Sequence, residues 1–173
     1  MDITGSTIFD QAARDIARCG ADNAGIIARM AEALIACFER GGKVLICGNG
    51  GSAAEAQHFA AEFINKIFTF RKALPALALT TDSSAITSIG NDLSFEDIFS
   101  RQVEALGCRG DILWGLSTSG GSANIIKAFA AARPAGLICI AFCGQPGSDM
   151  EARADITLTV ASGNTARIQE AHL

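Results

Sequence analysis

The stretch GNGGSAAEAQHFAAEF, from Gly48 to Phe63, decides the fold class that we predict for this chain. It follows the apolar run KVLIC (43–47), which is typical of a buried strand, and it passes from a glycine-rich turn straight into a helix-forming segment. Free N–H groups and the positive end of the helix dipole favour an anion at such a turn, and glycine lets the backbone approach it closely. A strand, a glycine-rich turn and a helix in this order therefore indicate an α/β fold with an anion site.

Four more short apolar runs follow, with helix-like segments between them. The five runs cover residues 43–47, 75–80, 111–117, 136–143 and 155–160, and the clearest helical segments cover residues 52–66, 95–106 and 122–133. Short apolar strands that alternate with helices predict a parallel sheet covered on both faces. The sequence thus predicts a doubly wound, five-stranded α/β domain.

Apolar residues also recur at helical spacing over residues 6–40, ahead of the first strand. We expect two helices here, divided at Gly20-Ala21-Asp22, with Asp22 as a candidate cap of the second helix. Gly41 and Gly42 are expected to end that helix. Residues 1–40 are thus predicted to be an N-terminal helical extension, and residues 41–173 the α/β core of the same single domain.

The composition limits the classes of function. The 173 residues are 49% apolar and only 18% charged, which predicts apolar surface buried between subunits. A net charge of -4 gives no basic footprint for nucleic acid. No apolar run approaches the ~20 residues of a membrane-spanning helix, and MDITGSTIFDQAARD lacks the regions of a signal peptide. We therefore expect a cytoplasmic protein with no membrane or nucleic-acid partner. The six cysteines form no CxxC pair, so no zinc knuckle or redox motif is indicated.

A second hydroxyl-rich loop follows the third predicted strand. The run STSGGS opens another helix, and its four hydroxyls can donate to phosphate oxygens from Ser117, Thr118, Ser119 and Ser122. One of them could serve only as a helix cap, but four exceed what a cap needs. Open α/β sheets bind ligands at the carboxyl ends of their strands, so we predict that GNGGS (48–52) and STSGGS (117–122) face one crevice.

His58 and Glu62 lie four residues apart in the helix after the first loop, so they project from the same side of it. A phosphorylated ligand anchored at the turn could extend past both side chains. An imidazole and a carboxylate together can move protons in general acid–base chemistry, or they can bind a divalent metal such as zinc. A surface pair of this kind would instead contribute only about 0.2–0.5 kcal/mol to the helix. The residues alone leave the choice between proton transfer and metal binding open.

The first loop also fits a dinucleotide-binding pattern, because residues 48–53 read G-x-G-x-x-A. That pattern needs an acid about 20 residues further on, at the end of the next strand, and Asp82 lies farther along the chain. A nicotinamide site would also leave STSGGS without a role. The two loops together favour a phosphate site over a nicotinamide-dependent oxidoreductase.

Several segments together resemble the phosphoheptose isomerases, or sedoheptulose 7-phosphate isomerases, of the sugar isomerase (SIS) domain superfamily. They are GNGGSAAEAQHFAAEF, ALTTDSSAITSIGND, IFSRQVEALG, GDILWGLSTSGGSANIIKA and TARIQEAH. The resemblance implies a flavodoxin-like sheet and a cytoplasmic homotetramer in which the N-terminal helices take part in assembly. It also implies conversion of D-sedoheptulose 7-phosphate into D-glycero-D-manno-heptose 7-phosphate, the first step toward the ADP-heptose of lipopolysaccharide or glycoprotein glycans.

The same resemblance implies roles for individual residues. Glu62 is the expected catalytic base, which moves a proton between C1 and C2 of the sugar through an enediol. One zinc ion per subunit is expected on His58, Glu62 and Gln169. Asn91 and Asp92 are expected to bind substrate from a polar loop after the second strand. The full set of implied substrate-binding residues is Asn49, Gly50, Gly51, Ser52, Glu62, Asn91, Asp92, Ser117, Thr118, Ser119, Ser122 and Gln169.

The resemblance further implies a histidine about two turns beyond Gln169, as a fourth metal ligand and acid. The sequence ends at Leu173, before that position, so we expect that the last helix is truncated here. His172 occupies a different position and is not expected to replace the missing histidine.

The main alternative is a non-catalytic SIS-domain protein that binds a phosphosugar or a partner protein, of the replication-initiator-associated type. Such relatives lack the helical carboxylate, which this chain keeps as Glu62 beside His58. That carboxylate favours the isomerase.

Overall fold

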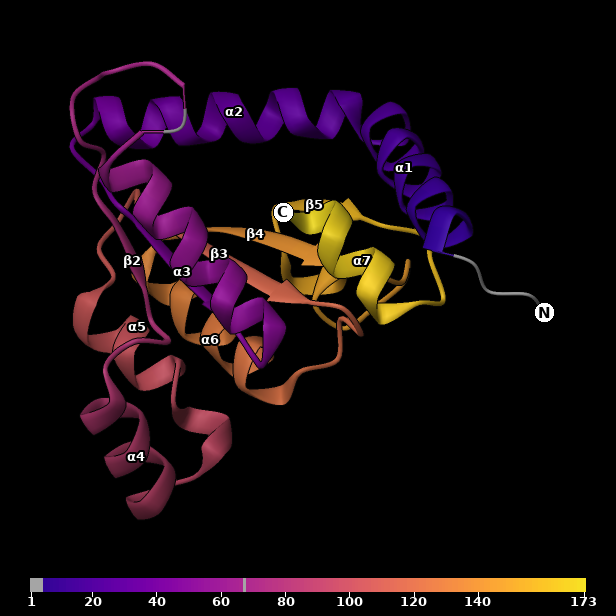
Figure 1. The fold of residues 1–173 in the computed structure, drawn as a ribbon. Helices are drawn as coiled ribbons and strands as arrows, with labels where there is room; N and C mark the ends of the chain where they lie inside the picture. The colour runs from indigo at the N-terminus through magenta and orange to yellow at the C-terminus, as the bar shows by residue number, and fades with distance from the viewer. Residues whose placement is uncertain (1–4, 67) are drawn as a thin grey trace.

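The computed structural model describes residues 5–66 and 68–173. Helices flank a central sheet, and α1 and α2 extend over one side of it (Figure 1). The strands are β1 (Val44–Gly48), β2 (Ala76–Ala78), β3 (Ile112–Ser117), β4 (Ile138–Cys143) and β5 (Ile156–Thr159). The helices are α1 (Gly5–Asp22), α2 (Ala24–Glu39), α3 (Gly51–Ile64), α4 (Ser83–Asp92), α5 (Ser100–Leu106), α6 (Ala123–Ala135) and α7 (Thr165–His172), with two 3-10 turns, η1 (Phe95–Asp97) and η2 (Glu151–Arg153).

All five strands are parallel, in the order β2-β1-β3-β4-β5. The chain builds the sheet in one direction from β1 to β2 and in the other from β3 to β5. This flavodoxin-like order confirms the predicted doubly wound sheet. Folds of this order bind ligands at the carboxyl ends of the strands where the direction reverses, which here is between β1 and β3.

Apolar residues fill both faces of the sheet. On one face, side chains of α1, α2, α3 and α7 pack against strand residues such as Val44, Ile46 and Trp114. On the other face, side chains of α5 and α6 pack against Leu45 and Leu113. Successive strand residues point to opposite faces, and both faces are covered, which explains why each strand appears in the sequence as a nearly continuous apolar run.

Gly115 lets α6 lie close to β3. A Cβ atom at this position would lie 2.6 Å from Cγ2 of Ile125 and 2.9 Å from Cε1 of Phe129. Both of these α6 side chains are buried. Because the STSGGS loop joins β3 to α6, this contact also sets the position of the loop.

Asp111 holds β1 and β3 together where the two strands begin. Its Oδ1 accepts a hydrogen bond from the N–H of Lys43 (2.9 Å), and its Oδ2 accepts from Nζ of Lys43 (2.6 Å) and the N–H of Cys108 (2.8 Å). Burial alone would raise the pKa of this carboxyl, but the hydrogen bonds from Lys43 and Cys108 outweigh burial and lower the pKa. The start of β1 is thereby tied to the loop before β3.

The two N-terminal helices divide at Asn23, so the prediction of Asp22 as the cap was wrong. Nδ2 of Asn23 donates to the carbonyls of Cys19 (2.9 Å) and Thr159 (3.1 Å), and its side chain makes no capping hydrogen bond to α2. Contact with the end of β5 therefore decides where the chain turns. Gly41 follows α2 with φ of 77°, as expected for a residue that ends a helix.

Three further segments differ from the predictions. Asn91 and Asp92 end helix α4 and do not lie in a polar loop, because the Asp82 carboxylate accepts from the N–H of Ala85 (2.9 Å) and starts a helix there. The helix predicted over residues 95–106 is divided into η1 and α5. The second strand has only three residues, since it forms the edge of the sheet.

Large apolar side chains remain on the surface of the chain. Phe9 and Ile35 on the N-terminal helices are 77% and 57% exposed, and Phe68 and Phe70 after α3 are 94% and 87% exposed. Exposed apolar residues of this size are typical of an interaction surface. Among the residues that the structure describes, no helix is both long and apolar enough to cross a membrane.

We expect Gly115→Ala to lower the free energy of unfolding by about 1–3 kcal/mol, because the added methyl group would overlap Ile125 and Phe129 in a packed core. Urea unfolding followed by circular dichroism measures this change. Gly25→Ala on α2 is the control, since its added Cβ atom would meet nothing within 4 Å. Equal unfolding midpoints in the two variants would contradict the proposed contact between α6 and the sheet.

Candidate active site

The loops after β1 and β3 meet at the carboxyl edge of the sheet and enclose a cavity of about 100 Å³. The pairing of β1 with β3 sets Gly48 opposite Leu116, so Asn49, the first residue after β1, follows at the level of Ser117, the last residue of β3. The cavity is lined by Asn49, Ser52, Leu116, Ser117, Thr118, Ser119, Ser122 and Gln169. One chain thus brings together residues of both predicted loops.

The serine hydroxyls of STSGGS form a connected cluster. Oγ of Ser117 lies 2.8 Å from Oγ of Ser122 and 3.3 Å from Oγ of Ser119. The N–H groups of Gly120 and Gly121 donate to the hydroxyl oxygens of Ser117 and Ser119, both at 3.2 Å. A hydroxyl hydrogen can rotate toward an acceptor. The serine hydroxyls can therefore donate hydrogen bonds to the oxygens of a phosphate in the cavity.

Both helices that begin at the cavity lack side-chain caps. Ser122 precedes α6 without a capping hydrogen bond, since its hydroxyl bonds Ser117. Gly50 precedes α3 with φ of 56°, a backbone conformation that favours glycine, and it has no side chain to cap the helix. The first N–H groups of a helix have no partner inside the helix. An anion in the cavity therefore faces the N-termini of α3 and α6.

Gln169 reaches the cavity from α7. A Cβ atom on Gly51 would lie 2.3 Å from Nε2 of Gln169, so the side-chain amide lies directly against the start of α3. Ile168 anchors this turn of α7 in the core, and Oδ1 of Asn164 caps the helix by accepting from the N–H of Ala166 (2.9 Å). An alanine at position 51 would therefore push the amide of Gln169 aside.

An amide pair joins the first loop to the start of α6. Nδ2 of Asn49 donates to Oδ1 of Asn124 at 2.9 Å, and Nδ2 of Asn124 donates to Oδ1 of Asn49 at 2.8 Å. Asn124 is the second residue of α6 and is buried. Sequence reasoning missed Asn124. The signal in the sequence was an asparagine two residues after STSGGS, near the start of the helix that this loop opens.

Glu55, also absent from the predicted site, is buried behind the first loop. It is 8% exposed, and among the described residues its Oε2 has no hydrogen-bond partner. Burial raises the pKa of this carboxyl, and the hydroxyl of Ser52 opposes the shift. Because Ser52 lines the cavity, Glu55 supports that wall from behind.

His58 and Glu62 lie farther along α3, away from the cavity. Glu62 follows Gly51 by three turns of helix, about 16 Å along the axis. It borders a second cavity of about 130 Å³ that is lined by Phe59, Glu62, Phe63, Arg71 and Trp114. Within the described part of the chain, the buried Oε2 of Glu62 has no hydrogen-bond partner, whereas His58 is exposed. One chain therefore does not bring this pair to the phosphate cavity.

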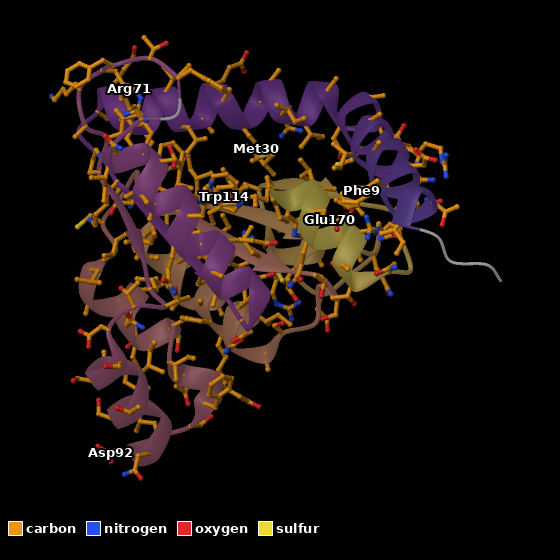
Figure 2. The ribbon with its side chains drawn as sticks, in the orientation of Figure 1. Phe9, Met30, Arg71, Asp92, Trp114 and Glu170 are labelled. Atoms are coloured by element: carbon orange, nitrogen blue, oxygen red, sulfur yellow. The ribbon has the colours of Figure 1, made fainter. Side chains whose placement is uncertain are left out.

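Arg71 lies beside Glu62 but does not pair with its carboxylate. Nη1 of Arg71 donates to the carbonyl of Phe63 (2.8 Å), and Nη2 donates to the main-chain carbonyl of Glu62 (2.9 Å). Figure 2 shows Arg71 beside the end of α3. The guanidinium thus fixes the end of the helix, and no donor among residues 5–66 and 68–173 pairs with Oε2 of Glu62.

Asn91 and Asp92 also lie away from the phosphate cavity. Both are exposed, and Nδ2 of Asn91 donates to Oδ1 of Asp92 at 2.7 Å. Figure 2 shows Asp92 at the tip of α4, far from Glu170, which follows Gln169 on α7. Within one chain, the implied substrate contacts of Asn91 and Asp92 are not at the same place as the serine cluster.

The predicted zinc ligands are not gathered within one chain. Among residues 5–66 and 68–173, no group of three or more His, Cys, Asp or Glu side chains could hold a metal ion. His58 and Glu62 share a face of α3, and the unpartnered Oε2 of Glu62 suits a cation, but Gln169 lies against Gly51 at the other end of the helix. Within one chain, Glu62 is therefore separated from Gln169 by most of the length of α3.

His172 faces the core. Its ring is 4% exposed and its centroid lies 5.4 Å from that of Phe142. Burial lowers the pKa of His172 to about 4, although the backbone at Cys143 opposes the shift, so the imidazole is neutral at pH 7.

A doubly wound sheet with an anion cavity between two glycine-rich loops defines a class of phosphosugar-binding α/β domains. The SIS domain family matches residues 8–144 of this chain. Phosphoheptose isomerases from Desulfovibrio desulfuricans and Campylobacter jejuni are each 53% identical to it, over 88% and 86% of this chain and 73% and 80% of their own lengths. The solved structure of a phosphoheptose isomerase from Neisseria gonorrhoeae matches with a TM-score of 0.90 and 44% identity, over 96% of this chain and 89% of that one.

The chain belongs to the phosphoheptose isomerases of the SIS domain family. The resemblance found in the sequence is thereby confirmed, and the chain is an isomerase. Neither a nicotinamide-dependent oxidoreductase nor a non-catalytic binding protein is supported.

We expect Gly51→Ala to lower kcat/KM by about 100-fold, because the new methyl group must displace the amide of Gln169 from the wall of the cavity. Steady-state kinetics with sedoheptulose 7-phosphate measures the loss. Gly20→Ala on α1 is the control, since its Cβ atom would meet nothing within 4 Å. Full activity in Gly51→Ala would mean that the position of Gln169 does not matter for catalysis.

Proposed function

We propose that this chain converts D-sedoheptulose 7-phosphate into D-glycero-D-manno-heptose 7-phosphate. The observation that carries the proposal is the cavity between the two loops, where hydroxyls and two helix N-termini converge. A phosphate bound there gains charge-assisted hydrogen bonds of about 1.5–3 kcal/mol each. That binding energy holds the sugar while a proton is moved at its other end.

Glu62 is the proposed general base. Its carboxylate takes a proton from C1 of the ketose to give an enediol, and it returns a proton to C2 to give the aldose, while a second proton moves from O1 to O2. The lone pairs of the buried Oε2 are free for this step, since no donor among the described residues occupies them. Phe59, Phe63 and Trp114 surround the carboxylate with apolar side chains and limit the access of water.

The reaction site is proposed to be shared between copies of the chain in a homotetramer. Glu62 and the phosphate cavity belong to opposite ends of α3, and Asp92 lies at the tip of α4 (Figure 2). A neighbouring copy can supply Glu62 to the cavity of the first. The exposed apolar side chains of α1 and α2, Phe9 and Ile35 among them, offer a surface for such contact.

Zinc is proposed to bind His58 and Glu62 of one copy and Gln169 of a neighbour. Imidazole and carboxylate are ordinary zinc ligands, and a bound zinc ion stabilises negative charge that develops on a substrate oxygen. The cytoplasmic location and the supply of heptose for ADP-heptose and lipopolysaccharide stay predictions of the family resemblance.

Glu62→Gln keeps the size of the side chain but cannot accept the proton, so we expect kcat to fall by about 100-fold or more. KM should change little, because the phosphate cavity is untouched. A coupled assay for the aldose product measures both constants. The control is Glu104→Gln, a change at an exposed residue that pairs with Arg101. A calorimetric zinc titration of the same variant tests the metal site, since the amide is a weaker ligand. Normal turnover in Glu62→Gln would remove Glu62 as the base.

The shared site predicts rescue between two inactive variants. Glu62→Gln lacks the base, and the double variant Ser119→Ala/Ser122→Ala lacks two phosphate donors. If Glu62 serves the cavity of another copy, subunits unfolded and refolded together should recover part of the activity, because some sites then combine an intact cavity with an intact base.

Light scattering must show that the mixed subunits form tetramers. The control is the same refolding of each variant alone, which should recover nothing. A monomer in solution, or mixed tetramers without activity, would contradict the shared site.

A further inference from the structure

We infer that Asn124 is a positioning residue of the isomerase, which holds the side-chain amide of Asn49 in the orientation that meets the substrate. The inference rests on the proposed function, and it concerns a residue outside both loops. Its evidence is the reciprocal pair of hydrogen bonds, 2.9 Å and 2.8 Å long, that joins residues 75 positions apart.

The two asparagines occupy unequal surroundings. Asn124 is 3% exposed, whereas Asn49 is only half-buried and lines the phosphate cavity. The next residue, Ile125, is fully buried and packs on Gly115 of β3 together with Phe129. The backbone of α6 at Asn124 is therefore held by the core, so we take the buried Asn124 as the member of the pair that positions Asn49.

The pair also determines what Asn49 can offer a ligand. A side-chain amide has two N–H donors and an oxygen with two lone pairs. The pair uses one donor and one lone pair of each residue, which leaves Asn49 with one N–H and one lone pair. If the amide of Asn49 alone turned over, its Oδ1 would face Oδ1 of Asn124 and its Nδ2 would face Nδ2 of Asn124, and both hydrogen bonds would be lost. Asn49 is thus held with a donor and an acceptor available at the cavity, where a sugar hydroxyl or a phosphate oxygen can use them.

A purely structural role for Asn124 predicts a different outcome. Asn23 is the comparison within the same chain, because it is also buried and its amide donates to Cys19 and Thr159 away from the cavity. Loss of either asparagine should lower stability. Loss of Asn124 should also change the catalytic constants, whereas loss of Asn23 should not. In a variant that already lacks Asn49, loss of Asn124 should have no further effect on them.

A double-mutant cycle tests the inference through Asn49→Ala, Asn124→Ala and the double variant. We expect each single change to lower kcat/KM for sedoheptulose 7-phosphate about tenfold, as for one lost hydrogen bond to substrate. The double variant should lose no more than Asn49→Ala alone, because Asn124 acts only through Asn49. Losses that multiply to about 100-fold would overturn the inference. So would an unchanged kcat/KM in Asn124→Ala.

Two controls keep the result interpretable. Asn23→Ala should lower the unfolding midpoint and leave kcat/KM unchanged, and Asn124→Leu, which fills the buried volume, replaces Asn124→Ala in the cycle if the latter does not fold. The dissociation constant for sedoheptulose 7-phosphate is also measured by calorimetry for each variant of the cycle. Wild-type protein that binds without turnover would contradict the proposed function, and the cycle on binding would still decide the role of Asn124. Wild-type protein that neither binds nor turns over the sugar would overturn both.

Discussion

The parallel pairing of β1 with β3 is the constraint on which the rest of the site depends. It sets Gly48, the last residue of β1, opposite Leu116, one residue before the end of β3, so the two strands deliver their loops to one place. Apart from Gln169, the residues that line the cavity come from these two strands, their loops and the first turn of α3. A slip of one residue in this pairing would turn the side chains to the other face of the sheet and separate the loops.

Local patterns predicted much of the fold and of the phosphate cavity. Strands covered on both faces appear in the sequence as nearly continuous apolar runs. The glycines and hydroxyls of GNGGS and STSGGS identify the two loops of the cavity. Both features can be recognised from neighbouring residues alone. Asn124 could not be found in this way, because its role depends on an amide 75 residues away. Asp22 and Asn23 are both good caps in sequence, and a hydrogen bond from Asn23 to Thr159 decides between them.

The spacing on α3 gave the direction of the side chains but not their surroundings. A separation of four residues places His58 and Glu62 on one face of any helix. The rise of the same helix, however, carries Glu62 about 16 Å from the turn that begins it. In the proposed tetramer, what stands opposite that face depends on contacts between chains, which no local pattern records. The proposed phosphate site and the proposed base thus belong to opposite ends of one helix, and only the proposed assembly of copies would join them.

Within one chain, Oε2 of Glu62 is buried without a hydrogen bond from any described residue, which lowers the free energy of unfolding. A buried polar atom left without a hydrogen bond costs about 1–3 kcal/mol, so folded proteins seldom keep one without a reason. Arg71 lines the same cavity as Glu62, yet it donates to the main-chain carbonyls of Glu62 and Phe63. Phe59 adds no donor to this cavity, and the buried indole N–H of Trp114 has no hydrogen-bond partner among the described residues. An ion pair with Arg71 would occupy the lone pairs that Glu62 needs in its proposed role as base or metal ligand. The fold instead holds this helix end through its backbone and leaves Oε2 of Glu62 without a partner among the described residues.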